Sequence, residues 1–224
     1  FYSYQPCSVT TIKYSIIVPV YNESETLYEM YKRVRVVMDD LDGPVELIFV
    51  NDGSEDHSME TMRELHAADP AVKIICFSRN FGHQMAITAG IDHALGQAVI
   101  VMDADLQDPP EVIPKLVEAW QLGAEVVLAV RASRLGESWF KRITASCFYR
   151  LINHLTDLEI PLDTGDFRLM DRKVVDVLKG VREHHRFMRG LSVWVGYKQA
   201  EVQYIRQQRF AGGTKYSLRQ MMRF

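Results

Sequence analysis

Residues Tyr14-Ser-Ile-Ile-Val-Pro-Val20 form a short, largely apolar run that is rich in Ile and Val. A run of this length and composition predicts a buried β-strand. A segment with helical periodicity follows at residues 23–39, and a second apolar run occupies residues 45–50. A strand, a helix and a second strand in this order predict a βαβ unit with two parallel strands.

The same alternation continues to residue 130. We predict further strands at residues 72–77, 98–102 and 125–130, and helices at residues 56–68, 84–95 and 110–122. Strands that alternate with helices of about 10–15 residues are typical of parallel sheets. We therefore predict an α/β fold with a Rossmann-like, mostly parallel sheet that is covered by helices on both faces.

The rhythm changes after residue 130. We predict helices at residues 138–156, 172–179 and 184–195, strands at residues 167–170 and 199–206, and a last helix that Thr214 or Ser217 caps.

Composition excludes several classes of protein. A hydrophobic content of 47% with 25% charged residues is that of a globular protein, neither disordered nor fibrous. The three cysteines lie far apart, which argues against a disulfide framework or a zinc site and favours a reducing compartment. No apolar run reaches the roughly 18–20 residues that cross a bilayer, so we expect any membrane anchor to lie outside these residues.

Charge is distributed unevenly along the chain. Residues 1–130 hold 8 Lys and Arg against 20 Asp and Glu, whereas residues 131–224 hold 18 against 9. An acidic half suits a metal ion, and a basic half suits phosphates or an anionic membrane surface. The alternative is an uneven but functionless distribution over a solvated surface.

Polar side chains follow four of the predicted strands. They lie in Pro19-Val-Tyr-Asn-Glu23, Asn51-Asp-Gly-Ser54, Ser78-Arg-Asn-Phe-Gly-His83 and Asp103-Ala-Asp-Leu-Gln107. In open α/β sheets the carboxyl ends of the strands meet at one edge, where ligands bind. The sequence therefore predicts a binding site at this edge.

Asp103 and Asp105 are the strongest candidates for holding a metal ion. Two carboxylates separated by one residue after a strand can reach the same cation, and Gln107 adds a neutral oxygen. Mg²⁺ and Mn²⁺ prefer oxygen ligands and often bridge protein carboxylates to substrate phosphates. A DxD pattern alone is a weak signal because Asp is common in turns, but its position after a strand supports the metal.

Other strand-end residues suit a nucleotide. Asp52 can accept hydrogen bonds from a base or ribose, and Glu23 can contact a ribose, although each also suits a turn or a helix start. Asn80, His83 and Gln84 can position a diphosphate or a sugar, and we assign His83 no catalytic role.

Missing motifs exclude other enzymes. The absence from the sequence of GxxxxGK[ST], of GxGxxG after the first strand and of GxSxG disfavours P-loop NTPases, nicotinamide dehydrogenases and α/β-hydrolases.

Together these motifs resemble family 2 inverting glycosyltransferases of the GT-A fold. The resemblance rests on Val18-Pro-Val-Tyr-Asn-Glu23, Val50-Asn-Asp-Gly-Ser54 and Met102-Asp-Ala-Asp-Leu-Gln-Asp-Pro-Pro110, and it covers roughly residues 14–220. DADLQDPP and Ser78-Arg-Asn-Phe-Gly-His83 resemble the polyprenyl-phosphate branch, which includes dolichol-phosphate mannose synthase and bacterial undecaprenyl-phosphate glucosyltransferases that modify O-antigen.

The resemblance implies a role for each group of residues. Asp103, Asp105 and Gln107 would hold Mg²⁺ or Mn²⁺, and Arg209 and Lys215 would bind the lipid phosphate. Asp105, Asp157 and Asp166 are the catalytic candidates, of which Asp157 and Asp166 can also be simple turn caps. The residues expected to bind the nucleotide sugar are Pro19, Tyr21, Glu23, Asp52, Asn80, His83, Gln84, Asp103, Arg131 and Arg134.

The expected reaction moves a hexose, with glucose from UDP-glucose as the first choice, onto undecaprenyl phosphate at the cytoplasmic face of the cell membrane. We expect an N-terminal arm (1–13), a catalytic domain (14–206) and a basic acceptor loop with a juxtamembrane helix (207–224). Residues 14–130 form the nucleotide-binding half of the domain, and residues 131–206 form its acceptor half. We expect no nucleic-acid partner, and a homo-oligomer stays open because the arm can pack against a second copy.

Three alternatives remain at this point. A family 2 transferase acting on a sugar hydroxyl would show the same strand-end motifs, but the basic C-terminal segment favours a membrane surface. A sugar nucleotidyltransferase would typically carry a glycine-rich signature near the first strand, which is missing. An inactive nucleotide-binding module is disfavoured by the intact DADLQ string.

Overall fold

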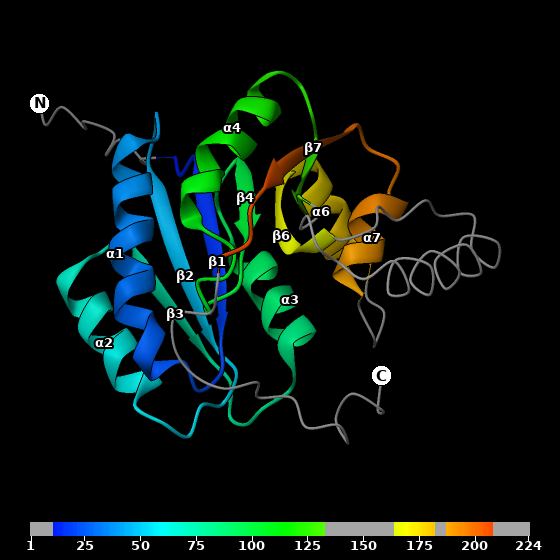
Figure 1. The fold of residues 1–224 in the computed structure, drawn as a ribbon. Coiled ribbons are helices and arrows are strands. Elements are labelled where there is room, and N and C mark those ends of the chain that lie inside the picture. The colour runs from blue at the N-terminus through cyan, green and yellow to red at the C-terminus, as the bar shows by residue number, and fades with distance from the viewer. Residues whose placement is uncertain (1–10, 133–163, 182–186, 208–224) are drawn as a thin grey trace, which may run out of the picture.

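The computed structural model describes residues 11–132, 164–181 and 187–207, which form a seven-stranded sheet between two layers of helices (Figure 1). The strands are β1 (Tyr14–Val20), β2 (Val45–Asn51), β3 (Val72–Cys76), β4 (Ala98–Val101), β5 (Val126–Arg131), β6 (Thr164–Asp171) and β7 (Gln199–Tyr204). The helices are α1 (Ser24–Asp40), α2 (Ser58–Ala68), α3 (His83–His93), the 3₁₀ helix η1 (Pro110–Val112), α4 (Ile113–Gln121), α6 (Arg172–Gly180) and α7 (Met188–Trp194).

The strand order is β3-β2-β1-β4-β6-β5-β7. In this sheet only β6 runs against its neighbours β4 and β5, and the remaining described strands point in one direction. The prediction of an α/β fold with a mostly parallel sheet is therefore confirmed. The predicted elements of the first 130 residues are confirmed, with ends that shift by one or two residues. The helices predicted at residues 138–156 and after Thr214 lie outside the described residues.

Two apolar layers separate the sheet from its helices. One face of the sheet packs against α1, α2 and α4, through side chains such as Leu27, Met62 and Leu116. The other face packs against α3, α6 and α7, through side chains such as Ile87 and Val174. Because both faces are covered, the central strands are apolar along their length, which explains the unbroken Ile and Val runs.

The register of β4 and β6 determines where polar side chains meet. These antiparallel strands pair Val101 with Arg168. When this register is continued by two residues beyond that pair, Asp103 stands opposite Asp166. Residues that face each other across an antiparallel pair point to the same side of the sheet. Here that side is the one covered by α3, so both carboxylates lie near the start of that helix.

Helix α3 approaches the sheet closely at Gly90. A Cβ at this position would lie 2.3 Å from a side-chain carbon of Ile17 in β1. Space for a methyl group is missing there, so Gly90 sets the distance between α3 and the strand.

We predict that Gly90→Ala destabilises the fold by about 1–3 kcal/mol, because a methyl group would overpack the core. Urea unfolding followed by circular dichroism measures this. Gly180→Ala in α6 is the matched control, since a Cβ there meets nothing within 4 Å and should leave stability equal or slightly higher. A Gly90→Ala protein as stable as the control variant would contradict the close approach.

Candidate active site

Asp52 holds the loop that leads into α3. It follows β2 and is buried, and its carboxylate accepts the N–H groups of Phe81 at 2.7 Å and of Gly82 at 3.0 Å. Gly53 has a φ of +69°, and a Cβ there would lie 2.4 Å from a backbone atom of the same loop, so glycine allows this approach. The loop is thereby fixed at the point where His83 begins α3.

A strained turn follows β4. Leu106 adopts a φ of +59°, a left-handed conformation that costs about 1–2 kcal/mol for a residue with a side chain. Its side chain is buried, and Oδ1 of Asp105 accepts the N–H of Gln107 at 3.0 Å. The buried leucine and this hydrogen bond hold the turn, which displays the 103–107 side chains in a fixed arrangement.

His83, Asp103 and Asp166 meet beside this turn. Nε2 of His83 lies 3.1 Å from Oδ2 of Asp166 and 3.4 Å from Oδ1 of Asp103. Arg189, from α7, donates two hydrogen bonds of 2.8 Å to the two oxygens of Asp166. One ligand atom each from His83, Asp103 and Asp166 lie within 4.8 Å of one another. We call these three residues the edge cluster.

Burial and charge shift the pKa values in the edge cluster in different directions. Burial and the neighbouring carboxylates raise the pKa of Asp103 to about 6, although His83 opposes this. Burial also acts to raise the pKa of Asp166, but Arg189 and His83 outweigh it and hold that pKa well below its usual range. Burial lowers the pKa of His83, but Asp166 and Asp103 more than offset this effect, so the pKa is raised.

The edge cluster fits a divalent cation. Oδ1 of Asp103 is buried and accepts no hydrogen bond from any residue that the structure describes. A buried carboxylate oxygen without a partner is costly, and a bound cation would supply the partner. Carboxylates suit both Mg²⁺ and Mn²⁺, whereas an imidazole suits transition-metal ions better than Mg²⁺. The two carboxylates and the imidazole of the edge cluster together offer a donor set for such a cation.

The metal ligands predicted from the sequence overlap with the edge cluster at Asp103. Asp105 and Gln107 belong to the adjacent turn, and they stay predicted ligands. His83 and Asp166 join Asp103 as candidates because the structure places them beside it. His83 was expected to bind the nucleotide sugar, and its position next to two carboxylates makes it a candidate metal ligand as well.

Several predicted nucleotide-sugar residues have partners within the protein. Oε2 of Glu23 accepts the hydroxyl of Thr26 at 3.1 Å. Oε1 of Gln84 accepts the N–H of Met188 at 3.1 Å, so this side chain joins α3 to the first turn of α7. Asp52 is occupied by the loop that it holds. Their predicted contacts with a nucleotide sugar stay predictions.

The remaining predicted residues fall into two groups. Pro19 is buried within β1, Tyr21 is exposed directly after it, and Asn80 is exposed in the loop before α3. Arg134, Asp157, Arg209 and Lys215 lie outside the described residues.

Arg131, at the end of β5, belongs to a second polar cluster. Its Nε donates to the hydroxyl of Tyr204 at 3.3 Å, and its Nη2 lies 3.8 Å from Oδ1 of the buried Asp108. The Tyr204 hydroxyl donates to the same Asp108 oxygen, and Nε of Arg206 lies 3.7 Å from it. Burial raises the pKa of Asp108, although Tyr204 and the two arginines oppose this. We call these four residues the arginine cluster.

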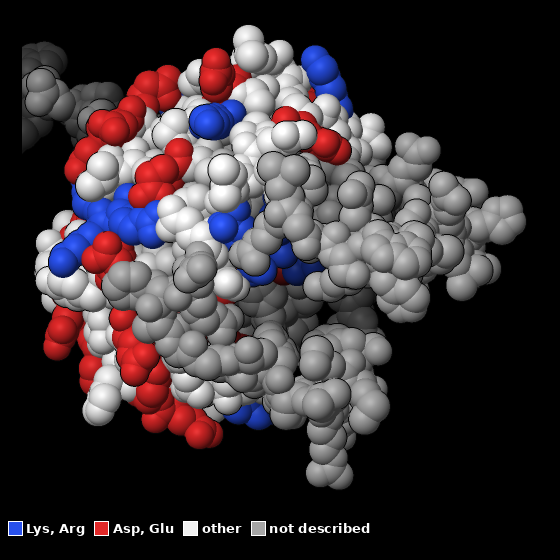
Figure 2. Space-filling model, in the orientation of Figure 1, with Lys and Arg blue, Asp and Glu red and all other residues white. Residues whose placement is uncertain are grey.

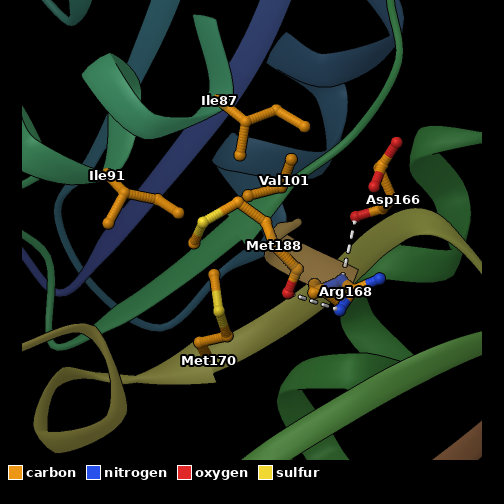
Figure 3. A pocket seen from close by; sticks show the side chains of 7 residues that line it. All are labelled: Ile87, Ile91, Val101, Asp166, Arg168, Met170 and Met188. Atoms are coloured by element: carbon orange, nitrogen blue, oxygen red, sulfur yellow. Dashed lines mark hydrogen bonds between the residues drawn. The ribbon is translucent and has the colours of Figure 1, made fainter. Parts of the chain in front are cut away.

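Arg168 lies beneath Asp166 and is 3% exposed. It donates to the carbonyl of Gly165 at 2.8 Å and to that of Met188 at 3.4 Å, so it ties β6 to α7 (Figure 3). The crevice beside it has an empty volume of about 170 Å³, less than the roughly 300–1,000 Å³ of ligand pockets. We therefore interpret Arg168 as a structural clamp that holds α7, and with it Arg189, against Asp166.

Acidic groups are prominent on one side of the described surface. Figure 2 shows acidic side chains gathered over the side of the molecule where α1 and α2 lie, with basic groups both among them and nearer the centre of this view. None of the described helices has the length and apolar character needed to cross a bilayer.

Comparison with known proteins gives relatives that match most of the chain. A family model described as glycosyl transferase family 2 matches residues 15–178. The uncharacterized glycosyltransferase YkcC of Bacillus subtilis is 58% identical over 95% of this chain and 66% of its own length. The bactoprenol glucosyl transferase of Shigella phage SfV is 45% identical over 92% of this chain and 67% of its own length. The chain thus spans about two thirds of the length of these curated relatives.

Solved structures share the fold at low sequence identity. The mannosyltransferase PcManGT from Pyrobaculum calidifontis, in complex with GDP-Man and Mn²⁺, has a TM-score of 0.60 and 18% identity over 89% of this chain and 59% of that one. Glucosyl-3-phosphoglycerate synthase from Mycobacterium tuberculosis, in complex with Mn²⁺ and UDP-glucose, has a TM-score of 0.59 and 19% identity over 94% and 74%. These likenesses establish the GT-A fold.

We predict that Mn²⁺ raises the melting temperature more at pH 7.5 than at pH 5. Protons compete with a cation for Asp103, whose pKa is about 6, and for His83, whose pKa is raised. Cation binding is therefore favoured above these pKa values and is lost as the pH falls through them. Differential scanning fluorimetry with and without Mn²⁺ measures the shift.

Asp103→Asn is the control for this experiment, because it removes the titrating carboxylate at nearly constant volume. The Mn²⁺-dependent shift should be small in this variant at both pH values. A shift equal to that of the wild type would show that the cation binds elsewhere.

Proposed function

Because the chain belongs to glycosyl transferase family 2, we propose that it transfers glucose from UDP-glucose to a polyprenyl phosphate, with undecaprenyl phosphate as the favoured acceptor. The relatives at 45% identity are named bactoprenol glucosyl transferases, which supports both the sugar and the lipid. The observation that carries the proposal is the edge cluster, in which a carboxylate oxygen of Asp103 lies beside His83 without a hydrogen-bond partner among the described residues, at the ligand-binding edge of a GT-A sheet.

The metal site lies where the donor diphosphate would leave. Asp103 would hold Mg²⁺ or Mn²⁺ together with His83 and Asp166, or with the DxD partner Asp105 and Gln107. When bound, the cation neutralises charge on the departing nucleoside diphosphate. Arg131 lies at the carboxyl end of β5 and supplies a guanidinium group for phosphate oxygens.

The reaction is an in-line substitution. An oxygen of the acceptor phosphate attacks the anomeric carbon while the bond to the diphosphate oxygen breaks, so the configuration inverts and UDP departs. A phosphate monoester has its second pKa near 6 and is largely ionised at neutral pH. This acceptor therefore needs no strong general base.

The state of Asp166 favours a phosphate acceptor over a hydroxyl. Transfer to a hydroxyl requires a base that takes up the proton. Asp166 is held ionised by the bidentate pair with Arg189, and its lowered pKa makes it a weak base. Its role is then to orient groups at the edge cluster, and the carboxylate does not need to accept a proton.

The cellular setting follows from the same lipid acceptor. We place the reaction at the cytoplasmic face of the cell membrane, where a glucosylated lipid can serve the modification of a surface polysaccharide such as O-antigen. In this proposal residues 14–206 form the catalytic domain, and the basic residues Arg209 and Lys215 after β7 meet the lipid phosphate.

We predict that membranes containing the protein transfer radiolabel from UDP-glucose to undecaprenyl phosphate when Mn²⁺ or Mg²⁺ is present. Thin-layer chromatography and mass spectrometry of the extracted lipid identify the product, and UDP is measured in parallel. GDP-mannose, UDP-N-acetylglucosamine and a glycan acceptor are tested in the same assay. Transfer to the glycan but not to the lipid would overturn the proposal.

Asp103→Ala should reduce this transfer by at least about 10³-fold, because the diphosphate would leave without charge neutralisation. The control is Asp176→Ala, which removes an exposed carboxylate from α6 and should retain wild-type activity. Wild-type turnover in Asp103→Ala would contradict the metal assignment.

A further inference from the structure

We propose that Asp108 is a positioning residue that, together with Tyr204, aims the guanidinium groups of Arg131 and Arg206 at a phosphate group of a substrate. This inference deepens the proposed function and rests on it for the identity of the substrates. Asp108 and Tyr204 do not contact the substrate in this proposal, and they act through the two arginines.

Two cations converge on one buried anion in the arginine cluster. The Asp108 side chain is fully buried, whereas those of Arg131 and Arg206 are each 30% exposed. Each arginine therefore has one guanidinium nitrogen near Asp108, while part of its side chain is open to solvent. Within the arginine cluster itself, two guanidinium groups against one carboxylate leave a net positive charge, which suits an anionic ligand; the carboxylates of Asp103 and Asp105 lie close enough to act on the cluster.

Distances in the cluster show that the carboxylate attracts the arginines without occupying their donors. Arg131 Nη2 and Arg206 Nε lie 3.8 and 3.7 Å from Oδ1 of Asp108, beyond the roughly 2.7–3.2 Å of a hydrogen bond. Nε of Arg206 and Oδ2 of Asp108 are buried without a hydrogen-bond partner among the described residues. Asp108 thus holds the two cations together against their mutual repulsion, and the exposed parts of the two guanidinium groups are left to meet an incoming phosphate.

Tyr204 fixes the orientation of this pair. Its hydroxyl donates to Asp108 and accepts from Nε of Arg131. Its ring packs edge-on against the buried Phe167, with the ring centres 5.9 Å apart. A tyrosine held at its ring and bonded at its hydroxyl restricts Arg131 to one direction.

The arginine cluster shares its backbone with the edge cluster. Asp108 ends the turn that begins at Asp103, and the N–H of Gln207 donates to the carbonyl of Gln107 in that turn at 2.9 Å. Gly165 immediately precedes Asp166, and a Cβ at Gly165 would lie 3.0 Å from Nη2 of Arg131. Arginines aimed from this position can meet a phosphate that also reaches the metal site.

Tyr204→Phe and Asp108→Asn test the proposal by equilibrium binding in the presence of Mn²⁺. Tyr204→Phe removes the hydroxyl without changing charge, and Asp108→Asn removes the charge at nearly constant shape. The donor arm compares the Kd values of UDP and uridine. The acceptor arm compares those of citronellyl phosphate, a short prenyl phosphate, and citronellol.

The contribution of phosphate to binding is the ratio of the two Kd values in an arm, without and with phosphate. In each variant this ratio should fall by about tenfold in at least one arm, which corresponds to the loss of roughly one charge-assisted hydrogen bond. Binding of uridine and citronellol should stay unchanged. The arm that responds tells whether the phosphate belongs to the donor or to the acceptor.

Tyr31→Phe is the matched control, because its hydroxyl donates to Asp69 away from both clusters. It should bind every ligand as the wild type does. Tighter phosphate binding in Asp108→Asn would overturn the proposal, since Asp108 would then compete with the ligand. Unchanged phosphate contributions in Tyr204→Phe in both arms would also overturn it.

These binding arms separate the present inference from the proposed function. A wild-type protein that transfers no glucose, while Tyr204→Phe still loses phosphate affinity, would refute the proposed function and leave the positioning role supported.

Discussion

Strand β6 runs against β4, and its register sets Asp166 opposite Asp103 on the side of the sheet covered by α3. Two carboxylates this close repel each other unless cations lie near them. Arg189 and His83 supply part of the compensation, and they leave Asp103 with a raised pKa and with an oxygen that has no hydrogen-bond partner among the described residues. A site with this excess of negative charge is prepared for a divalent cation, and the rest of the arrangement follows from that need.

Residues on both faces of β6 fix the charged side chains of the two clusters in place. Arg168 clamps α7 to β6, so that Arg189 reaches Asp166. Side chains alternate between the two faces of a strand, so the Gly165 position faces the opposite side from Asp166 and makes room for Arg131. One reversed strand thus lies between an anionic cluster that suits a cation and a cationic cluster that suits an anion, and both clusters lie at the same edge of the sheet. A nucleotide sugar and a phosphate acceptor require both kinds of group close together.

The first 130 residues were predictable because their signals are local. The apolar runs of β1, β2 and β4 are strands buried on both faces, whereas the edge strand β3 is only partly buried. The ends of these strands carry the polar groups that the topology brings to the binding edge. The structure of the second half was less predictable, because the direction of β6 and its place between β4 and β5 depend on strand pairings that no local sequence pattern encodes. Arg189, Tyr204 and Arg206 were missed for the same reason, since each resembles an ordinary surface or strand residue until the tertiary structure supplies its partner.

Asp103 was predicted from its position after a strand, whereas its partners were predicted only in part. The DxD spacing pointed to Asp105 along the chain, and the structure adds His83 and Asp166 from other elements. His83 had no visible signal beyond its place in a strand-end motif, and a single histidine is more often structural. Its contact with two carboxylates arises from the loop that Asp52 fixes, which is a tertiary effect.

The most direct measurement is the anomalous difference density of crystals grown with Mn²⁺ and UDP-glucose. Our account predicts one manganese peak within coordinating distance of the Asp103 carboxylate and of a diphosphate oxygen of the nucleotide. A manganese ion bound away from Asp103, or a nucleotide sugar bound without any metal at this edge of the sheet, would contradict it.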